Sequence, residues 1–285
     1  GLIGAVDEEN SSYHFKEAAE AGLPMAAFVM AMRTDQGLGV KADPLQTIRW
    51  LEVAKKGGHA GAIYELGSLY LKGRLVDQDL TKARKLFEEA IILGVPAAFN
   101  DLGFMYMNSH GVPQDIEKAK QFFKEGMSRG YKLSIYNYGL LFGRFGSSDE
   151  DFQKAERYLR RAISEGYDRA DTSLGLLLDS KATTLNSDPW EIAGLFKRGA
   201  DRGEPESLYQ YGKILLVGEG VEQNSKKAKE YLNKAAASGN VGLLSAVGEV
   251  YEEMAPAEEN KSIAFGLYQQ AAAKGHVFSI WKVGE

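Results

Sequence analysis

The sequence predicts an all-α fold, an α/α superhelical solenoid of about seven helix–turn–helix repeats. The first observation is a recurring pattern of two apolar helical stretches, separated by a glycine turn and ended by a glycine. The second is that these closing glycines keep a period of 35 to 37 residues along the chain: Gly22, Gly57, Gly94, Gly130, Gly166, Gly203, Gly239 and Gly275. A period of this length is the signature of a stacked repeat array.

The third observation is another glycine register, inside the first helix of each repeat. Its members are Gly67, Gly103, Gly139, Gly175, Gly212, Gly248 and Gly284. A glycine within a helix costs about 1 kcal/mol relative to alanine, so we expect the partner helix to approach closely and compensate. The expected small partner residues are Ala83, Ala119, Ala155 and Ala228. Each closing glycine is expected to be left-handed, and Gly146, in a variant turn, is expected to tolerate substitution much better.

These registers divide residues 1–285 into a single continuous array without a linker. The predicted repeats are 23–57, 58–94, 95–130, 131–166, 167–203, 204–239 and 240–275. Residues 1–22 are interpreted as the second helix of a truncated preceding repeat. Residues 276–285 are interpreted as the start of a truncated further repeat, so both ends are expected to be cut from a longer protein.

The repeat 95–130 carries the most complete set of motifs. In chain order these are Leu102-Gly103, Tyr106, the Gly111-Val112-Pro113 loop, Lys118-Ala119, Phe122-Phe123 and Gly130. The combination resembles the Sel1-like repeat, a relative of the tetratricopeptide repeat, and the resemblance covers nearly all of the chain. It implies a superhelical solenoid that serves as an adaptor or scaffold in protein–protein interaction, because known members are mostly adaptors.

The sequence offers no motif for catalysis, for a metal site or for a cofactor. Cysteine is absent, and no His-Glu-x-x-His pattern supplies zinc ligands. The four histidines are scattered over different repeats: His14, His59, His110 and His276. A net charge of −5 argues against a nucleic-acid partner. No apolar run approaches the roughly 20 residues that span a bilayer, so no membrane span is predicted within this stretch.

Partner binding is predicted on the concave face, which the first helices line in the related tetratricopeptide fold. The predicted partner-binding residues are Tyr64, Lys72, Asn100, Phe104, Asn108, Tyr136, Arg144, Tyr209 and Lys213. The amide of Asn100 is expected to hold a peptide backbone, whereas Tyr64 and Tyr136 fit structural packing equally well. The basic members of this set favour an acidic or carboxylate-bearing ligand, and a solvated charged face is the competing interpretation. The far end is expected to be acidic, with Glu249, Glu252 and Glu253.

The sequence thus predicts a non-catalytic scaffold that binds a protein or peptide through its concave face. One alternative is a component of cell-envelope or polysaccharide assembly or export, or a secreted factor that meets host cells. An enzyme is the third and least favoured alternative, kept because a fold never excludes chemistry. No compartment, cofactor or oligomeric state is predicted.

Overall fold

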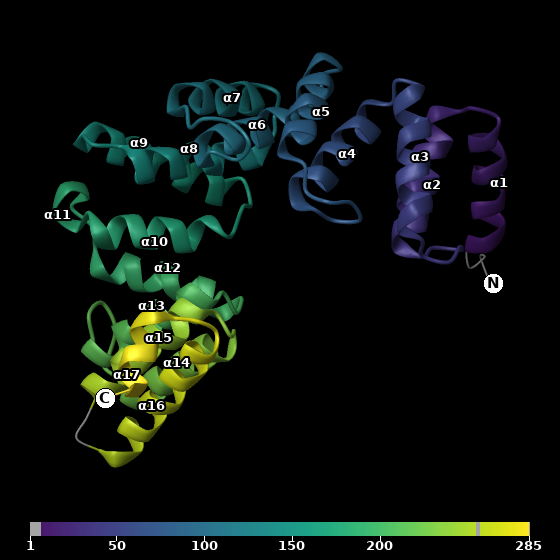
Figure 1. The fold of residues 1–285 in the computed structure, drawn as a ribbon. Coiled ribbons are helices and arrows are strands. Elements are labelled where there is room, and N and C mark those ends of the chain that lie inside the picture. Colours follow the sequence, from purple (N-terminus) through teal and green to yellow (C-terminus); the bar gives the residue numbers. More distant parts are fainter. Residues whose placement is uncertain (1–6, 255–256, 285) are drawn as a thin grey trace, which may run out of the picture. The chain divides into compact units, whose positions relative to one another are not determined.

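The computed structural model describes residues 7–254 and 257–284, and every regular element within these ranges is a helix. Residues 255 and 256, inside the predicted repeat 240–275, and the terminal residues 1–6 and 285 lie outside the described ranges. The helices are α1 (Glu8–Glu20), α2 (Pro24–Gln36), α3 (Pro44–Lys56), α4 (Ala60–Lys72), α5 (Leu80–Ile92), α6 (Pro96–Asn108), α7 (Ile116–Ser128), α8 (Lys132–Phe145), α9 (Asp149–Ser164), α10 (Ala170–Ser180), α11 (Ala182–Leu185), α12 (Pro189–Asp201), α13 (Pro205–Val217), α14 (Ser225–Ala237), α15 (Val241–Glu253), α16 (Glu258–Ala273) and α17 (Val277–Gly284). The predicted all-α fold class is confirmed (Figure 1).

Successive helices pair as hairpins. The hairpins that pack most extensively are α2–α3, α4–α5, α6–α7, α10–α12, α13–α14 and α15–α16. The short helix α11 lies in the connection between α10 and α12, while α1 packs on α2 and α17 on α16. The chain forms two compact units, unit 1 (Gly1–Leu141) and unit 2 (Phe142–Glu285), with the division inside α8.

Aspartates at equal positions begin the second helices of the first three hairpins. The carboxylates of Asp43, Asp79 and Asp115 accept hydrogen bonds from backbone N–H groups in the first turns of α3, α5 and α7. Such side-chain caps satisfy donors that the helix itself leaves unpaired, each worth about 1 kcal/mol. The repeated cap therefore sets the start of the second helix at the same place in these three hairpins.

A ring on the second helix lies over the glycine of the first helix. A Cβ atom at Gly103 would be 2.6 Å from Cε1 of Phe123, and one at Gly175 would be 2.9 Å from Cε1 of Phe196. The predicted close approach therefore occurs, but the side chain over Gly103 is Phe123 rather than the predicted Ala119. The alanines Ala83, Ala119, Ala155 and Ala228 are fully buried. Ala228 does contact its glycine, because its backbone oxygen is 3.3 Å from the Cβ position of Gly212, where the nearest side chain is that of Leu232.

The tolerance predicted for Gly146 is also wrong. A Cβ atom there would be 2.3 Å from the backbone oxygen of Phe142 and 2.6 Å from Cβ of Asp151. A backbone oxygen at the end of α8 cannot move aside as a flexible side-chain tip can. The turn after α8 is thus as tightly packed around its glycine as the helix interfaces are.

The closing glycines are left-handed with one exception. Gly94 and Gly130 have φ values of 80° and 79°, in the region that favours glycine. In the first hairpin the left-handed residue is Gly58, with φ 78°, rather than the expected Gly57. Gly57 serves another purpose, because a Cβ atom there would be 2.2 Å from Cγ of Pro24.

Candidate functional site

Side-chain hydrogen bonds connect three successive first helices in unit 1. The hydroxyl of Tyr64 on α4 donates to Oδ2 of Asp101 on α6 over 3.0 Å. Nδ2 of Asn100 donates to Oδ1 of Asp101 over 3.1 Å. Nδ2 of Asn137 on α8 donates to Oδ1 of Asn100 over 2.8 Å. We call these four residues the polar ladder.

The two amides of the polar ladder lie inside the protein. Asn100 is 2% exposed and Asn137 is 7% exposed, whereas Tyr64 and Asp101 are half-buried. Asn100 was expected to offer its amide to a peptide backbone, but both ends of the amide are occupied within the ladder. Buried polar groups require such partners. Asn100 therefore holds the carboxylate of Asp101 in place through its hydrogen bond.

Burial has the largest effect on the pKa values of Tyr64, Glu65 and Asp101, which lie on the surface at the polar ladder. It raises the pKa of Asp101, against the opposing effects of the hydrogen bonds from Tyr64 and Asn100 and of the charge of Lys72. Burial likewise raises the pKa of Tyr64, and the charge of Asp101 adds to that shift. Burial also raises the pKa of the neighbouring Glu65, which the charges of Lys72 and Arg74 oppose. The surface therefore holds two carboxyl groups that are poorly solvated.

The other predicted residues of unit 1 lie on the same helices with varied exposure. Lys72 is exposed at the end of α4, and Phe104 and Tyr136 are half-buried. The ring of Phe104 meets that of His110 edge-on at a centroid distance of 5.4 Å. Nδ2 of Asn108 donates to the backbone oxygen of Phe104 over 3.0 Å, so this amide bonds its own helix.

The remaining predicted residues belong to unit 2. Arg144 is exposed, and its guanidinium carbon is 5.1 Å from the ring centroid of Phe145. Lys213 Nζ is 5.2 Å from the ring centroid of Tyr209. Burial raises the pKa of Tyr209, as do the charges of Glu249, Glu206 and Glu253. Lys213 therefore stands beside acidic residues rather than in a basic patch.

The acidic end predicted from Glu249, Glu252 and Glu253 is partly neutralised. The carboxylate of Glu252 accepts from Lys282 Nζ over 2.9 Å and from the Tyr268 hydroxyl over 2.8 Å. These bonds, that from Lys282 first, lower the pKa of Glu252. Glu252 thus stabilises the packing of α17 on α15 and α16.

Glu65, Asp101 and Asn137 were not predicted as site residues. Each lies two positions before the glycine of its first helix, whereas the predicted residues lie three positions before such a glycine, or one or five positions after it. The sequence did contain a sign of them, because a polar residue recurs at this same position in three successive repeats. It was missed because the spacing alone does not say which neighbouring position faces the next helix.

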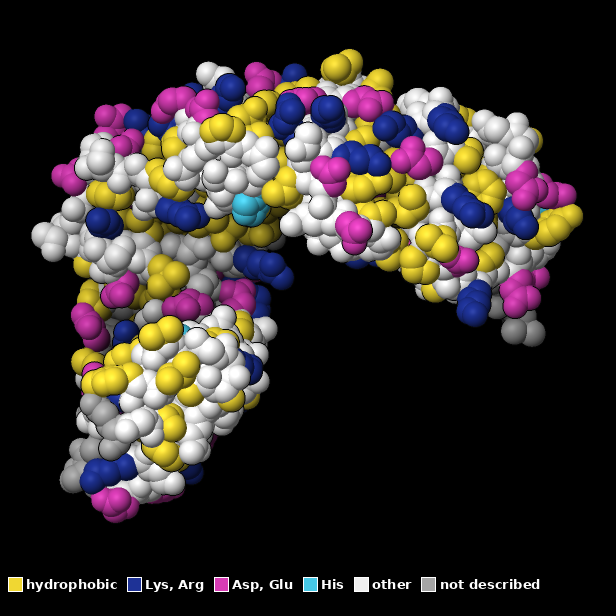
Figure 2. Space-filling view, in the orientation of Figure 1, with side chains coloured by type: hydrophobic (Ala, Val, Ile, Leu, Met, Phe, Trp, Pro, Cys, Tyr) yellow, Lys and Arg dark blue, Asp and Glu magenta, His cyan; other side chains and the backbone are white. Residues whose placement is uncertain are grey.

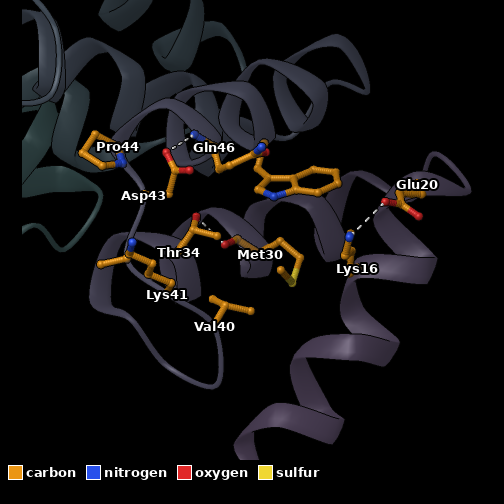
Figure 3. Close-up of a pocket in the computed structure, with 11 residues that line it drawn as sticks. Lys16, Glu20, Met30, Thr34, Val40, Lys41, Asp43, Pro44 and Gln46 are labelled. Carbon is orange, nitrogen blue, oxygen red and sulfur yellow. Dashed lines mark hydrogen bonds and ion pairs between the residues drawn. The ribbon is translucent and has the colours of Figure 1, made fainter.

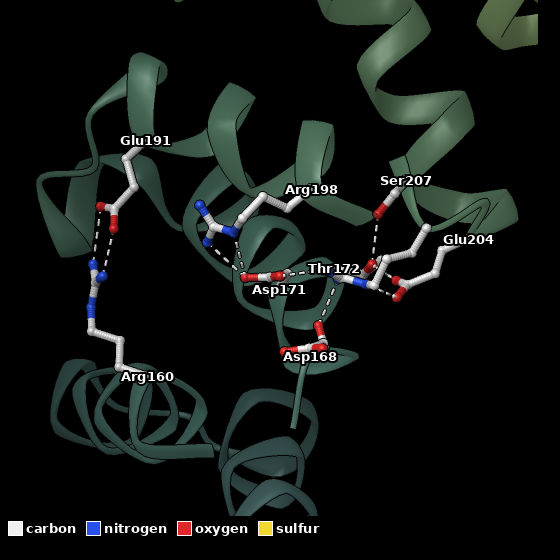
Figure 4. A network of polar contacts seen from close by, with 9 residues as sticks. Arg160, Asp168, Asp171, Thr172, Glu191, Arg198, Glu204 and Ser207 are labelled. Atoms are coloured by element: carbon white, nitrogen blue, oxygen red, sulfur yellow. Dashed lines mark hydrogen bonds and ion pairs between the residues drawn. The ribbon is translucent and has the colours of Figure 1, made fainter. Parts of the chain in front are cut away.

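A second polar network joins α10 and α12 in unit 2 (Figure 4). We call this pair the divergent hairpin, because the additional helix α11 lies in its connection. The side chain of Asp171 on α10 is 3% exposed, and it receives Arg198 Nη2 over 2.7 Å and Arg202 Nη1 over 2.9 Å. Nearby, Nη2 of Arg160 on α9 donates to Glu191 on α12 over 3.0 Å. Breaking one partner of a buried ion pair is costly, so this network stabilises α10 on α12.

Neither a cluster of metal-ligating side chains nor a membrane-spanning helix occurs among the described residues. Among them, no group of three histidine, cysteine, aspartate or glutamate side chains lies close enough to hold a metal ion. In the same ranges, none of the helices combines the length and the apolar character that crossing a membrane requires.

Stacked helical hairpins with equivalent contacts at each step define the class of α-solenoid repeat proteins. The Sel1 repeat model matches residues 24–59, 60–95, 96–131, 132–167, 205–240 and 247–276. The chain therefore belongs to the Sel1 repeat family, as its motifs predicted. The hairpin with the second polar network, α10–α12, is the one left unmatched between 167 and 205.

Solved structures share the fold. The uropathogenic Escherichia coli protein c5321, a protective antigen with an SLR fold, matches with a TM-score of 0.71 and 24% identity over 98% of this chain. The chain spans 59% of that structure's length. A Sel1 repeat protein from Oxalobacter formigenes matches with a TM-score of 0.65 and 21% identity, over 81% of this chain and 99% of its own. Yeast Tom70 matches with a TM-score of 0.56 and 12% identity, over 95% of this chain and 55% of its own. No curated protein matches the sequence.

Proposed function

We propose that the protein is a non-catalytic scaffold that binds a protein or peptide on the first helices of unit 1. The observation that carries this proposal is the polar ladder. It joins α4, α6 and α8 at equivalent positions and leaves the side chains of Tyr64 and Asp101 half-exposed. Extended surfaces of equivalent residues are the usual binding surfaces of solenoid proteins.

The ladder favours binding because its groups are already held in place. Ordering a side chain on association costs about 0.5–1.5 kcal/mol, and Asp101 has been ordered by Tyr64 and Asn100 before a partner arrives. Tyrosine is also one of the residue types that contribute most to interface energy. A partner that covers Tyr64 gains these contacts at a low entropic cost.

The charges of the surface favour hydrogen-bond donors on the partner. The basic residues suggested an acidic ligand, but the charge of Lys72 already acts on Glu65 and Asp101. Arg74 is occupied as well, since its Nη1 and Nη2 donate to Asp35 over 2.7 and 3.0 Å. On the face of unit 1 seen in Figure 2, basic and acidic side chains are interspersed. A polypeptide with amide or cationic donors fits this surface better than a nucleic acid.

The proposal is tested with two sets of substitutions in unit 1. The surface set is Tyr64→Ala, Lys72→Ala and Phe104→Ala. The control set is Arg49→Ala, Lys85→Ala and Gln121→Ala, three exposed residues at one register position in α3, α5 and α7. Partners captured from cell extract by the immobilised protein are quantified by mass spectrometry, and helix content is checked by circular dichroism.

We expect the surface set to lower partner recovery by about tenfold or more, the effect of losing one or two major interface residues. The control set should leave recovery unchanged. Loss of recovery with the control set alone would place the partner on the second helices and overturn the proposal.

A further inference from the structure

A pocket of about 660 Å³ lies between α1, α2, α3 and the segment that connects α2 to α3 (Figure 3). Its lining includes Lys16 and Glu20 from α1, Met30 and Thr34 from α2, and Trp50 from α3. The volume falls in the range of about 300–1,000 Å³ that is usual for small-ligand sites. The pocket shares no residue with the polar ladder, and it is independent of the function proposed above.

The repeats show which side chains are missing from this pocket. Helices α2, α4 and α6 begin at residues 24, 60 and 96, so residues 36 apart are equivalent. Thr34 occupies the place of Tyr70 and Tyr106. By the same register, Gln46 replaces Lys82 and Lys118, and Trp50 replaces Leu86 and Phe122.

In the next two hairpins, a tyrosine ring and a lysine occupy part of the equivalent space. Nζ of Lys82 is 3.9 Å from the ring centroid of Tyr70. The ring of Tyr106 stacks on that of Phe122, with centroids 5.6 Å apart and planes 16° from parallel. Phe122 occupies the position of Trp50 in the third hairpin. The residue at this position is therefore the one on which the tyrosine ring stacks.

Thr34 cannot replace that ring. It is 5% exposed, its hydroxyl donates to the backbone oxygen of Met30 over 2.8 Å, and it accepts from the hydroxyl of Thr47 over 3.1 Å. Its side chain is thus held at the base of the pocket. The corresponding pocket beside the third hairpin, lined by Tyr106 and Lys118, has a volume of about 380 Å³. The larger pocket coincides with the loss of the ring and the lysine.

We propose that the pocket of Thr34 and Trp50 binds a planar aromatic group, stacked on the indole of Trp50 where a tyrosine ring lies in the third hairpin. Aromatic rings stack favourably in offset geometry, and Met30 and Val40 supply apolar contacts. The group carries a hydroxyl or a carboxylate. Lys41 lines the pocket, is exposed and has no ion-pair partner among the described residues, and it faces an anionic or hydroxyl substituent.

Such a group has two sources, an aromatic side chain of a bound polypeptide or a free aromatic acid. Two probes distinguish them: 4-hydroxyphenylacetate, and the neutral peptide acetyl-Gly-Tyr-Gly-amide. Cyclohexylacetate is the matched non-planar control. The readout is the indole N–H signal of Trp50 in the ¹⁵N-labelled full chain, which has three tryptophans and therefore three such signals. The Trp50 signal is assigned with Trp50→Leu, a residue that Leu86 shows to fit this position.

We expect a saturable shift of the Trp50 signal with one or both aromatic probes, no shift of the Trp190 and Trp281 signals, and at least tenfold weaker binding of cyclohexylacetate. A response to the acid alone identifies a small aromatic acid as the ligand class. A response to both probes shows that the aromatic side chain of a polypeptide is sufficient for binding in the pocket. Absence of a saturable Trp50 shift at millimolar concentrations of both probes overturns the proposal.

Refilling the pocket supplies a second test. The double substitution Thr34→Tyr and Gln46→Lys restores the residues found in the next two hairpins, and it should weaken probe binding at least tenfold while keeping helix content. Trp50→Leu removes the stacking surface without refilling the space, and calorimetry should show a similar loss. Wild-type affinity in either folded variant contradicts the assignment of the pocket.

Discussion

The ring of Phe123 lies against the backbone of Gly103, so closely that a Cβ atom at Gly103 would be 2.6 Å from its Cε1 atom. The same relationship recurs between Gly67 and Phe87, and between Gly248 and Tyr268. Glycine costs helix stability at these positions, and the buried ring contact offsets that cost. The pairing of one glycine with one ring is therefore the contact that fixes how the first helix sits on the second helix in these hairpins.

Two glycines of the divergent hairpin provide a matched test of this contact. Gly175 on α10 lies under Phe196, whereas Gly194 on α12 has nothing within 4 Å of its Cβ position. We expect Gly175→Ala to destabilise the protein by about 1–3 kcal/mol through overpacking. Gly194→Ala should stabilise it by about 0.5–1 kcal/mol, because alanine is the better helix former. Urea midpoints measure both, and shifts in the same direction would refute the glycine–ring account.

Asp101 should make stability depend on pH. Burial raises its pKa in the folded state above the ordinary value of 3.8, so the folded protein holds this proton more tightly than the unfolded chain does. The resulting stabilisation is fully present below pH 3.8 and is lost as the pH rises through the raised folded value. Urea midpoints from pH 3 to pH 7 should show the wild type losing stability relative to Asp101→Asn as the pH rises. A difference that is constant, or that grows in the opposite direction, would contradict the assignment.

The buried carboxylate of Asp171 and the exposed Arg160–Glu191 pair should differ in their contribution to stability. Asp171→Ala removes a carboxylate that is 3% exposed and receives two arginines, and we expect a loss of about 1.5–3 kcal/mol, as for hydrogen bonds to charged groups. Glu191→Gln weakens the Arg160 pair, whose side chains are 43% and 37% exposed. Exposed pairs contribute about 0–1 kcal/mol. Denaturation at low and high salt checks the order, and an equal cost for both substitutions would show that burial does not govern this network.

The repeat period in the sequence predicted most of the fold. Gly103 and its equivalents marked the first helices, and Gly130 and its equivalents marked the ends of the second helices. The identity of the residue over each glycine did not follow, because spacing assigns Ala119 and Phe123 to one face without giving their side-chain conformations. Gly146 was misjudged for a related reason, since its neighbour is a backbone oxygen, which no sequence pattern represents.

The site was harder to predict than the fold. The hydroxyl of Tyr64 bonds Asp101 where α4 meets α6. Asn100, however, is buried, and Asp101 beside it is the half-exposed acid. Successive residues of a helix are rotated by about 100° around its axis. An error of one position therefore exchanges the buried residue, Asn100, with the half-exposed residue, Asp101. The hydrogen bond between Asn100 and Asn137 joins residues one repeat apart, and only the packing of α6 on α8 makes it visible.

The central claim is that the first helices of unit 1 bind the partner, and site-specific photo-crosslinking tests it most directly. A benzoylphenylalanine replaces Phe104 on α6 in one variant and Gln121 on α7 in the other, two positions of the same hairpin. Each variant is irradiated in cell extract, and covalent adducts are identified by mass spectrometry. We expect adducts with a defined polypeptide from position 104 and none with that polypeptide from position 121. Adducts from position 121 in the absence of any from position 104 would contradict this claim.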